Sequence, residues 1–176
     1  CIAPGPILTI VPLYLNRAMG VSQADLRDII WLPPAAWGIG YFFWGWIADR
    51  YAAGNRRPIG LFAMLTIFAL AFGFTPWTSS LPVAMFLISW AAFIGGGFQM
   101  TALKVGSYAF PREQAAMMSG IASGAFALEN AILSPYFGQL LDLKQYDALF
   151  WIIAVFPVVG ISLWAVLTRN EQVGAN

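Results

Sequence analysis

Glu129 is the one carboxylate that lies well inside a long apolar stretch of this 176-residue sequence. If that stretch crosses a membrane, the ionised side chain is costly to bury, which suits a role in proton or ion exchange. A polar contact inside a helical bundle, or a place in an outer vestibule, explains Glu129 equally well. Neighbouring Asn130 faces another direction on a helix, so the two side chains cannot line one pore equally. Gln99, beside the glycines of 95–97, is a third candidate, either for substrate or for a neighbouring helix.

A cluster of charge at the end of another apolar run is the second chemical feature. It consists of one carboxylate, three arginines and two glycines: Asp49, Arg50, Arg56, Arg57, Gly45 and Gly54. The carboxylate can pair with an arginine or lie at a neighbouring helix N-terminus, and so hold one set of helices against another. By charge alone, plain anchoring of the helix end at a membrane surface is the favoured interpretation.

The composition excludes several kinds of chemistry. The sequence has no histidine and a single cysteine, Cys1, which excludes a disulfide framework, most zinc sites and a histidine-activated nucleophile. It has no glycine-rich phosphate loop with its lysine, which argues against ATP-driven transport. A net charge of +1 leaves no electrostatic footprint for nucleic acid. We expect a protein that is not an enzyme and needs no cofactor.

The elements that position these residues are long and apolar. Hydrophobic residues make up 60% of the sequence and charged residues 10%, whereas soluble domains carry about 25% charged residues. Roughly 20 apolar residues cross a bilayer core as a helix, and such runs are too continuous for barrel strands. The sequence therefore predicts an all-α polytopic membrane protein with six transmembrane helices and a polar loop at 22–28. The runs cover about 2–15, 29–48, 59–77, 82–103, 115–137 and 148–167, with kinks expected at Pro33-Pro34, Pro135 and Pro157.

Basic residues predict the orientation of these helices. Six follow the second, fourth and sixth runs, and three follow the first, third and fifth. The first group is Arg50, Arg56, Arg57, Lys104, Arg112 and Arg169; the second is Arg17, Arg27 and Lys144. The positive-inside rule then places the first group and the C-terminus in the cytoplasm, with Lys104 and Arg112 as simple anchors.

The charge cluster resembles the signature loop of the major facilitator superfamily, Gly-x-x-x-Asp-Arg-x-Gly-x-Arg-Arg, with two extra residues before Gly54. That loop joins the second and third helices of a six-helix half, as the cluster does here. The resemblance implies a conformational latch at Asp49, Arg50, Arg56 and Arg57. Three further segments, Pro12–Leu15, Gly20–Ser22 and Trp31–Pro33, resemble the anion:cation symporter branch, and Phe110–Arg112 fits the superfamily.

The resemblance also implies a C-terminal half built from two inverted three-helix repeats. Gly138 and Asp142 repeat the Gly-x-x-x-Asp spacing of the charge cluster, on what the predicted topology makes the opposite membrane face. Because the sequence is apolar from its second residue, we expect residues 1–176 to be one bundle whose N-terminal half is missing. In the superfamily the first helix of this half lines the cavity, so Tyr14 and Asn16 are further candidates, although Tyr14 also fits an interfacial anchor.

The expected function is secondary active transport across the bacterial inner membrane by alternating access. The branch implies a sugar acid or related organic anion, carried with a proton or sodium ion. The apolar interior offers no evident cationic partner for an anion, so that partner would be Arg17 or a residue of the missing half. The alternative is an autonomous six-helix scaffold or channel subunit. A membrane-embedded enzyme is disfavoured, because no paired carboxylates lie inside the apolar runs.

Overall fold

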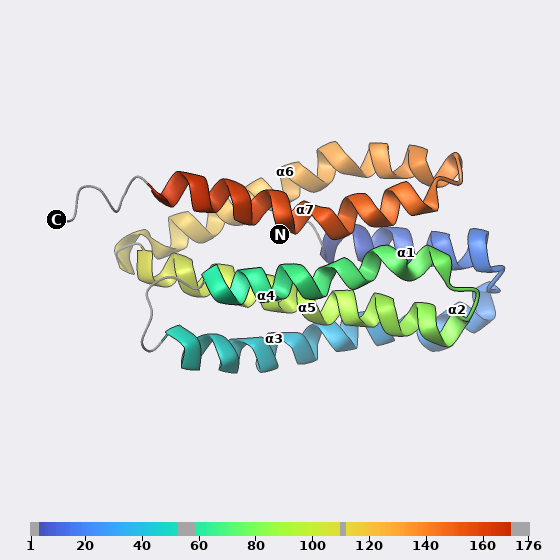
Figure 1. Cartoon of the computed structure of the whole chain (residues 1–176), viewed down its shortest axis with the longest axis horizontal. Coiled ribbons are helices and arrows are strands. Elements are labelled where there is room, and N and C mark those ends of the chain that lie inside the picture. Colours follow the sequence, from blue (N-terminus) through green and yellow to red (C-terminus); the bar gives the residue numbers. More distant parts are fainter. Residues whose placement is uncertain (1–3, 53–58, 110–111, 170–176) are drawn as a thin grey trace.

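The computed structural model describes residues 4–52, 59–109 and 112–169, and every regular element in these ranges is helical. The long helices lie alongside one another (Figure 1). This confirms the prediction of an all-α protein. In chain order the elements are α1 (Pro4–Met19), α2 (Gln23–Ile29), α3 (Leu32–Ala52), α4 (Ile59–Ala69), η1 (Leu70–Trp77), α5 (Leu81–Ala109), η2 (Arg112–Gln114), α6 (Ala115–Asp142) and α7 (Tyr146–Arg169).

Most of each predicted apolar run falls on a long helix, or, for 59–77, on α4 and the 3₁₀ segment η1 that continues it. The run at 29–48 begins three residues too early, because residue 29 ends α2 and α3 begins at Leu32. Within the described residues, three segments are long and apolar enough to cross a membrane: Ile59–Trp77, Leu81–Lys104 and Tyr146–Val166. These segments support an integral membrane protein.

Two local predictions were wrong. The supposed polar loop at 22–28 contains α2, because Ser22 caps a new helix by accepting a hydrogen bond from the Asp25 amide at 3.2 Å. Pro33 and Pro34 do not kink a helix but lie in the first turn of α3. In the first turn of a helix the backbone N–H groups have no carbonyl partner within the helix, so a proline, which lacks the N–H, costs no hydrogen bond there.

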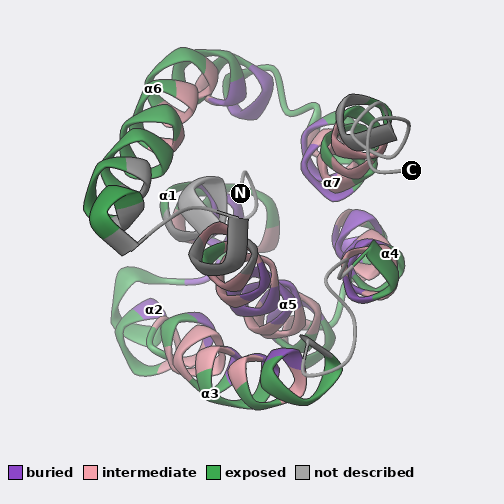
Figure 2. Cartoon of the chain, turned by 90° about the vertical axis from the view of Figure 1, so that its left-hand side faces the viewer, coloured by how far each residue is buried: buried purple, intermediate pink, exposed green. Residues whose placement is uncertain are grey.

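Helix α5 lies centrally among the other helices, and the buried residues gather on it and on the faces turned toward it (Figure 2). One core cluster joins α1, η1, the C-terminal turns of α6 and the N-terminal turns of α7 around Ile88 of α5. A second joins α3 and α4 around Ile94 of α5. Most of α6 before Asn130 is exposed, and this part of the helix stands apart from the bundle in Figure 2.

Helices α3 and α5 make the most extensive contact in the structure, and glycine permits it. A methyl group added to Gly40 would lie 2.4 Å from the backbone oxygen of Phe93. One added to Gly96 would lie 2.9 Å from the backbone oxygen of Trp37. The two backbones therefore touch directly, as small residues allow in membrane helix pairs. Static packing is thus one role of the glycine cluster in α5.

The last eight residues of the 59–77 span form a 3₁₀ helix, which is long for this conformation. Pro76 has no N–H to donate to the Phe72 carbonyl four residues earlier. The Thr75 hydroxyl donates to that carbonyl instead, at 2.8 Å. Gly73 lies directly under the Trp151 ring, where an added methyl group would come within 2.8 Å. The sequence of η1 and its contact with α7 together account for the tighter winding.

Candidate functional site

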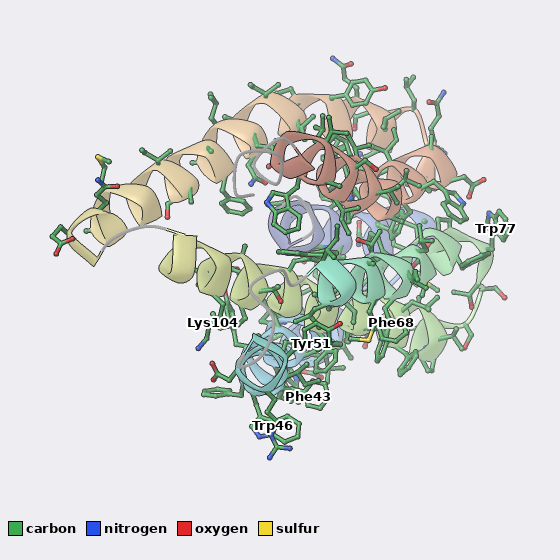
Figure 3. The ribbon with its side chains drawn as sticks, turned by 60° about the vertical axis from the view of Figure 1, so that its left-hand side comes forward. Phe43, Trp46, Tyr51, Phe68, Trp77 and Lys104 are labelled. Atoms are coloured by element: carbon green, nitrogen blue, oxygen red, sulfur yellow. The ribbon has the colours of Figure 1, made fainter. Side chains whose placement is uncertain are left out.

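The charged residues gather at two opposite ends of the bundle. We call them the Lys104 end and the Trp77 end, after two residues labelled in Figure 3. The Lys104 end contains the C-terminal turns of α3 and α5. The Trp77 end contains the C-terminal ends of α1, η1 and α6 and the beginning of α7.

At the Lys104 end, the ammonium of Lys104 on α5 donates a hydrogen bond to the carboxylate of Asp49 on α3. Both side chains are partly exposed, so the pair lies at the rim of the bundle rather than in its core. Sequence reasoning treated Lys104 as an anchor and missed this pairing. The sequence did contain a signal for the pairing: Asp49 and Lys104 each follow directly after an apolar run, and both runs are predicted to end at the same membrane face.

Arg50 does not join that ion pair within the described residues. Its guanidinium lies 4.0 Å from the centre of the Trp46 ring, in a cation–π contact on the surface of α3. Gly45, one turn before Asp49, faces the Met100 side chain. A methyl group added to Gly45 would lie 3.7 Å from the Met100 sulfur. The remaining predicted latch residues, Gly54, Arg56 and Arg57, lie outside the described residues.

A second ion pair lies at the Trp77 end. The guanidinium of Arg17, near the end of α1, donates to Asp142, the last residue of α6, at 2.6 Å. Asp142 is the residue that repeats the Gly-x-x-x-Asp spacing of Gly45 and Asp49. Each of the two spacing motifs thus ends in an aspartate that is paired with a cation from another long helix.

Tyr14 and Asn16 are used in packing at the Trp77 end. The Tyr14 side chain is 2% exposed, with its ring centre 4.7 Å from that of Phe150. Its hydroxyl donates to the Thr75 carbonyl at 3.4 Å. The Asn16 amide donates to the Val21 carbonyl at 2.9 Å and closes the turn between α1 and α2. Tyr14 also contributes to the lining of a pocket at this end of the bundle.

Glu129 and Asn130 lie midway along α6 and are half-buried. The Asn130 amide donates to the Phe126 carbonyl of its own helix at 2.9 Å. Glu129 makes no hydrogen bond or ion pair with any residue that the structure describes. Of the two, Glu129 is therefore the one whose side chain has no hydrogen-bond or ion-pair partner among the described residues.

Gln99 is also half-buried, on α5 two residues past the glycine cluster. Its amide makes no hydrogen bond within the described part of the chain. An unpaired amide at membrane depth is costly unless another group or water satisfies it. Gln99 on α5 and Glu129 on α6 are thus the two predicted candidates with unused polar groups.

The described residues contain no group of three acidic, histidine or cysteine side chains able to hold a metal ion. The arrangement instead offers isolated polar groups on apolar helices, with ion pairs at both ends.

The comparison with known families defines the class. Residues 5–175 match the sequence model of the Major Facilitator Superfamily. The chain belongs to this family, so the resemblance seen in the signature loop is confirmed. No solved structure matches the chain significantly.

Two curated relatives are named as transporters. The glycerol-3-phosphate transporter of Bacillus subtilis (strain 168) is 30% identical over 173 residues, which make up 92% of this chain and 38% of the relative. The hexuronate transporter of Escherichia coli (strain K12) is 22% identical over 174 residues, which make up 93% of this chain and 39% of the relative. The chain spans about two fifths of the length of each.

Proposed function

We propose that the chain is the C-terminal six-helix half of a secondary transporter for a small organic anion. The observation that carries the proposal is the family match over residues 5–175, together with relatives named for two anionic solutes, glycerol 3-phosphate and hexuronate. Because the chain spans about two fifths of those relatives, the remaining helices would form the other side of the substrate cavity. Substrate would bind between the halves near mid-membrane.

The six long helices would form two inverted repeats, with α1, α3 and α4–η1 in one and α5, α6 and α7 in the other. The two ion pairs support this arrangement. Asp49 in the second helix of the first repeat pairs with Lys104 in the first helix of the second. Asp142 in the second helix of the second repeat pairs with Arg17 in the first helix of the first. In each pair, the aspartate comes from the second helix of one repeat and the cation from the first helix of the other repeat.

The pairs would fasten the two repeats to each other at both ends, so that the half rocks as one body during alternating access. This gives the predicted latch residue Asp49 a role inside its own half. The positive-inside bias supports an orientation in which the Lys104 end and the C-terminus would lie in the cytoplasm. The exposed part of α6 before Asn130 would pack against the other half.

Glu129 would couple transport to a proton or sodium ion. It is half-buried in the apolar part of α6, and no described residue neutralises it. A carboxylate in this position binds a proton or cation readily, because its bare charge is costly to hold there. Gln99 on α5 would contribute a hydrogen bond to the substrate.

The test is uptake of radiolabelled glucuronate and glycerol 3-phosphate by the full-length protein in vesicles, with and without an imposed proton or sodium gradient. We expect gradient-driven uptake of at least one anion, and loss of the gradient dependence in Glu129→Gln. The matched control is Glu113→Gln, since Glu113 is an exposed glutamate just before α6. Absence of uptake for a broad panel of carboxylates and phosphates would refute the anion proposal. Uptake by these 176 residues alone would refute the need for a second half.

A further inference from the structure

The Trp77 end contains a pocket of about 960 Å³. It is bounded by the last turn of α1, the turn between η1 and α5, and the turn between α6 and α7. Glu129, Gln99 and Asn130, the half-buried candidates for transport, do not line it, whereas Tyr14 and Arg17 do. The pocket is therefore separate from Glu129 and Gln99, the two residues given roles in the proposed transport.

Two cations and several hydrogen-bond donors line this pocket. Arg17 and Lys144 supply the positive charge. Arg17 is engaged with Asp142 at 2.6 Å, whereas the side-chain ammonium of Lys144 makes no ion pair or hydrogen bond with any described residue. The side chains of Ser79, Gln145 and Tyr146 also line the pocket and have no hydrogen-bond partner within the described part of the chain.

The pocket also has one acidic residue, Asp147. It lies in the first turn of α7, where the N-terminal end of the helix dipole partly offsets a negative charge. With Arg17 balanced by Asp142, the remaining charges are those of Lys144 and Asp147. The free ammonium and the neutral donors thus favour an anion that can reach Lys144 while staying clear of Asp147.

The backbone of Lys144 gives independent support for a function. Lys144 has a φ of 57°, the one left-handed non-glycine residue among those described. Its amide donates to Leu141 at 3.1 Å and the Gln145 amide donates to Leu140 at 2.9 Å, which is the Schellman pattern that ends α6. Glycine is the favoured residue at this position, because it adopts the left-handed conformation without steric cost. A lysine in the left-handed conformation makes the folded state less stable than a glycine would. This cost fits a residue whose side chain has a function of its own.

We propose that this pocket binds an oxyanion of the phosphate type, with Lys144 as its cationic ligand. Ser79, Gln145 and Tyr146 supply neutral hydrogen bonds to the same group. Two sources offer this chemistry: a water-soluble phosphate compound, or the headgroup of an anionic phospholipid at the membrane surface. The pocket and its ligand do not depend on the transport proposal.

The test is calorimetric titration of inorganic phosphate into the full-length protein in neutral detergent, at constant ionic strength. We expect Lys144→Gly to weaken the binding by about tenfold or more, since a charge-assisted hydrogen bond is lost. Without phosphate, the same variant is expected to unfold at a temperature equal to or above that of the wild type, because glycine suits the left-handed position. Lys144→Arg keeps the charge and should retain binding, and Asp147→Asn should strengthen it.

A second arm distinguishes the two sources. The protein is placed in nanodiscs of phosphatidylcholine with or without phosphatidylglycerol, and phosphate is titrated again. If phosphatidylglycerol abolishes the Lys144-dependent binding, the lipid headgroup fills the pocket; if binding persists, the ligand is a soluble anion. The proposal is overturned if phosphate binding is absent from both media, or if Lys144→Gly binds phosphate as tightly as the wild type. Uptake and its dependence on Glu129 are measured separately, so equal binding by Lys144→Gly and the wild type would leave the transport proposal standing.

Discussion

Arg17 and Asp142 are 125 residues apart in the sequence, yet the guanidinium of one lies 2.6 Å from the carboxylate of the other. The contact joins the end of α1 to the end of α6. Its counterpart at the opposite end of the bundle joins Asp49 of α3 to Lys104 of α5. Each aspartate ends a Gly-x-x-x-Asp segment, and each cation comes from a long helix distant in the sequence.

Each pair should contribute a small but measurable coupling energy. The side chains of Arg17 and Asp142 are 44% and 70% exposed, so water screens their attraction. A double-mutant cycle with Arg17→Ala and Asp142→Ala should give about 0.2–1 kcal/mol of coupling, measured by reversible unfolding in detergent.

The matched control is the exposed pair Arg27–Asp28, whose atoms are 3.4 Å apart on adjacent residues. This pair joins no separate helices, so its cycle should give a coupling near zero. Equal couplings in the two cycles would mean that the Arg17–Asp142 contact adds nothing to the fastening of α1 to α6.

Two glycines of α3 should respond to alanine in opposite ways. Gly40→Ala should destabilise the protein by about 1–3 kcal/mol, because the new methyl group meets the Phe93 backbone oxygen at 2.4 Å. Gly38→Ala should stabilise it by about 0.5–1 kcal/mol, since nothing lies within 4 Å and alanine favours the helix. Thermal unfolding of both variants measures the difference. If Gly40→Ala stabilised the protein as Gly38→Ala is expected to do, α3 and α5 would not be in direct backbone contact.

Tyr14 should behave as a core residue rather than as a substrate ligand. Tyr14→Phe should cost less than about 1 kcal/mol, because the hydrogen bond to the Thr75 carbonyl is long at 3.4 Å. Tyr14→Ala should cost about 3–5 kcal/mol, since it empties the space beside Phe150 and Tyr146. The check is unfolding together with the KM of uptake. A KM raised several-fold in Tyr14→Phe, with stability unchanged, would return Tyr14 to the cavity.

Gln99→Leu should separate stability from function. Removing an amide that has no partner within the described residues should stabilise the protein by about 1 kcal/mol. If Gln99 binds substrate, the same variant should transport at least tenfold less efficiently, judged by kcat/KM. A destabilised variant would instead mean that Gln99 bonds to protein groups, and unchanged transport would remove it from the site.

Much of the fold is predictable from composition and run length. The third run at 59–77 coincides with α4 and η1, and the fifth at 115–137 begins where α6 begins. Long apolar stretches bounded by charge are a strong signal, because the membrane leaves the backbone few alternatives to a helix. Of the candidate residues, Glu129 was predicted from its isolation in such a stretch, and the structure leaves it without a described partner.

The tertiary pairings were not predictable in the same way. Lys104 and Arg17 each have several acidic residues within reach of a plausible fold, and a single sequence does not say which one is chosen. Tyr14 was ambiguous for a similar reason, because a tyrosine at the end of an apolar run fits a cavity, an interface or a core. The left-handed backbone at Lys144 is set by the chain reversal after α6, for which the sequence offers no glycine at that position.

The 3₁₀ winding of Leu70–Trp77 has a consequence for bilayer thickness. A 3₁₀ helix rises about 2.0 Å per residue against about 1.5 Å for an α-helix, so eight residues gain roughly 4 Å. The 19-residue span Ile59–Trp77 then reaches about 32 Å instead of about 28 Å. A hydrocarbon core is about 30 Å thick. The tighter winding thus gives the shortest of the three apolar spans about the length of the 21-residue span Tyr146–Val166 without an added turn. Rewinding η1 as α-helix would draw Trp77 away from the membrane surface toward the lipid tails.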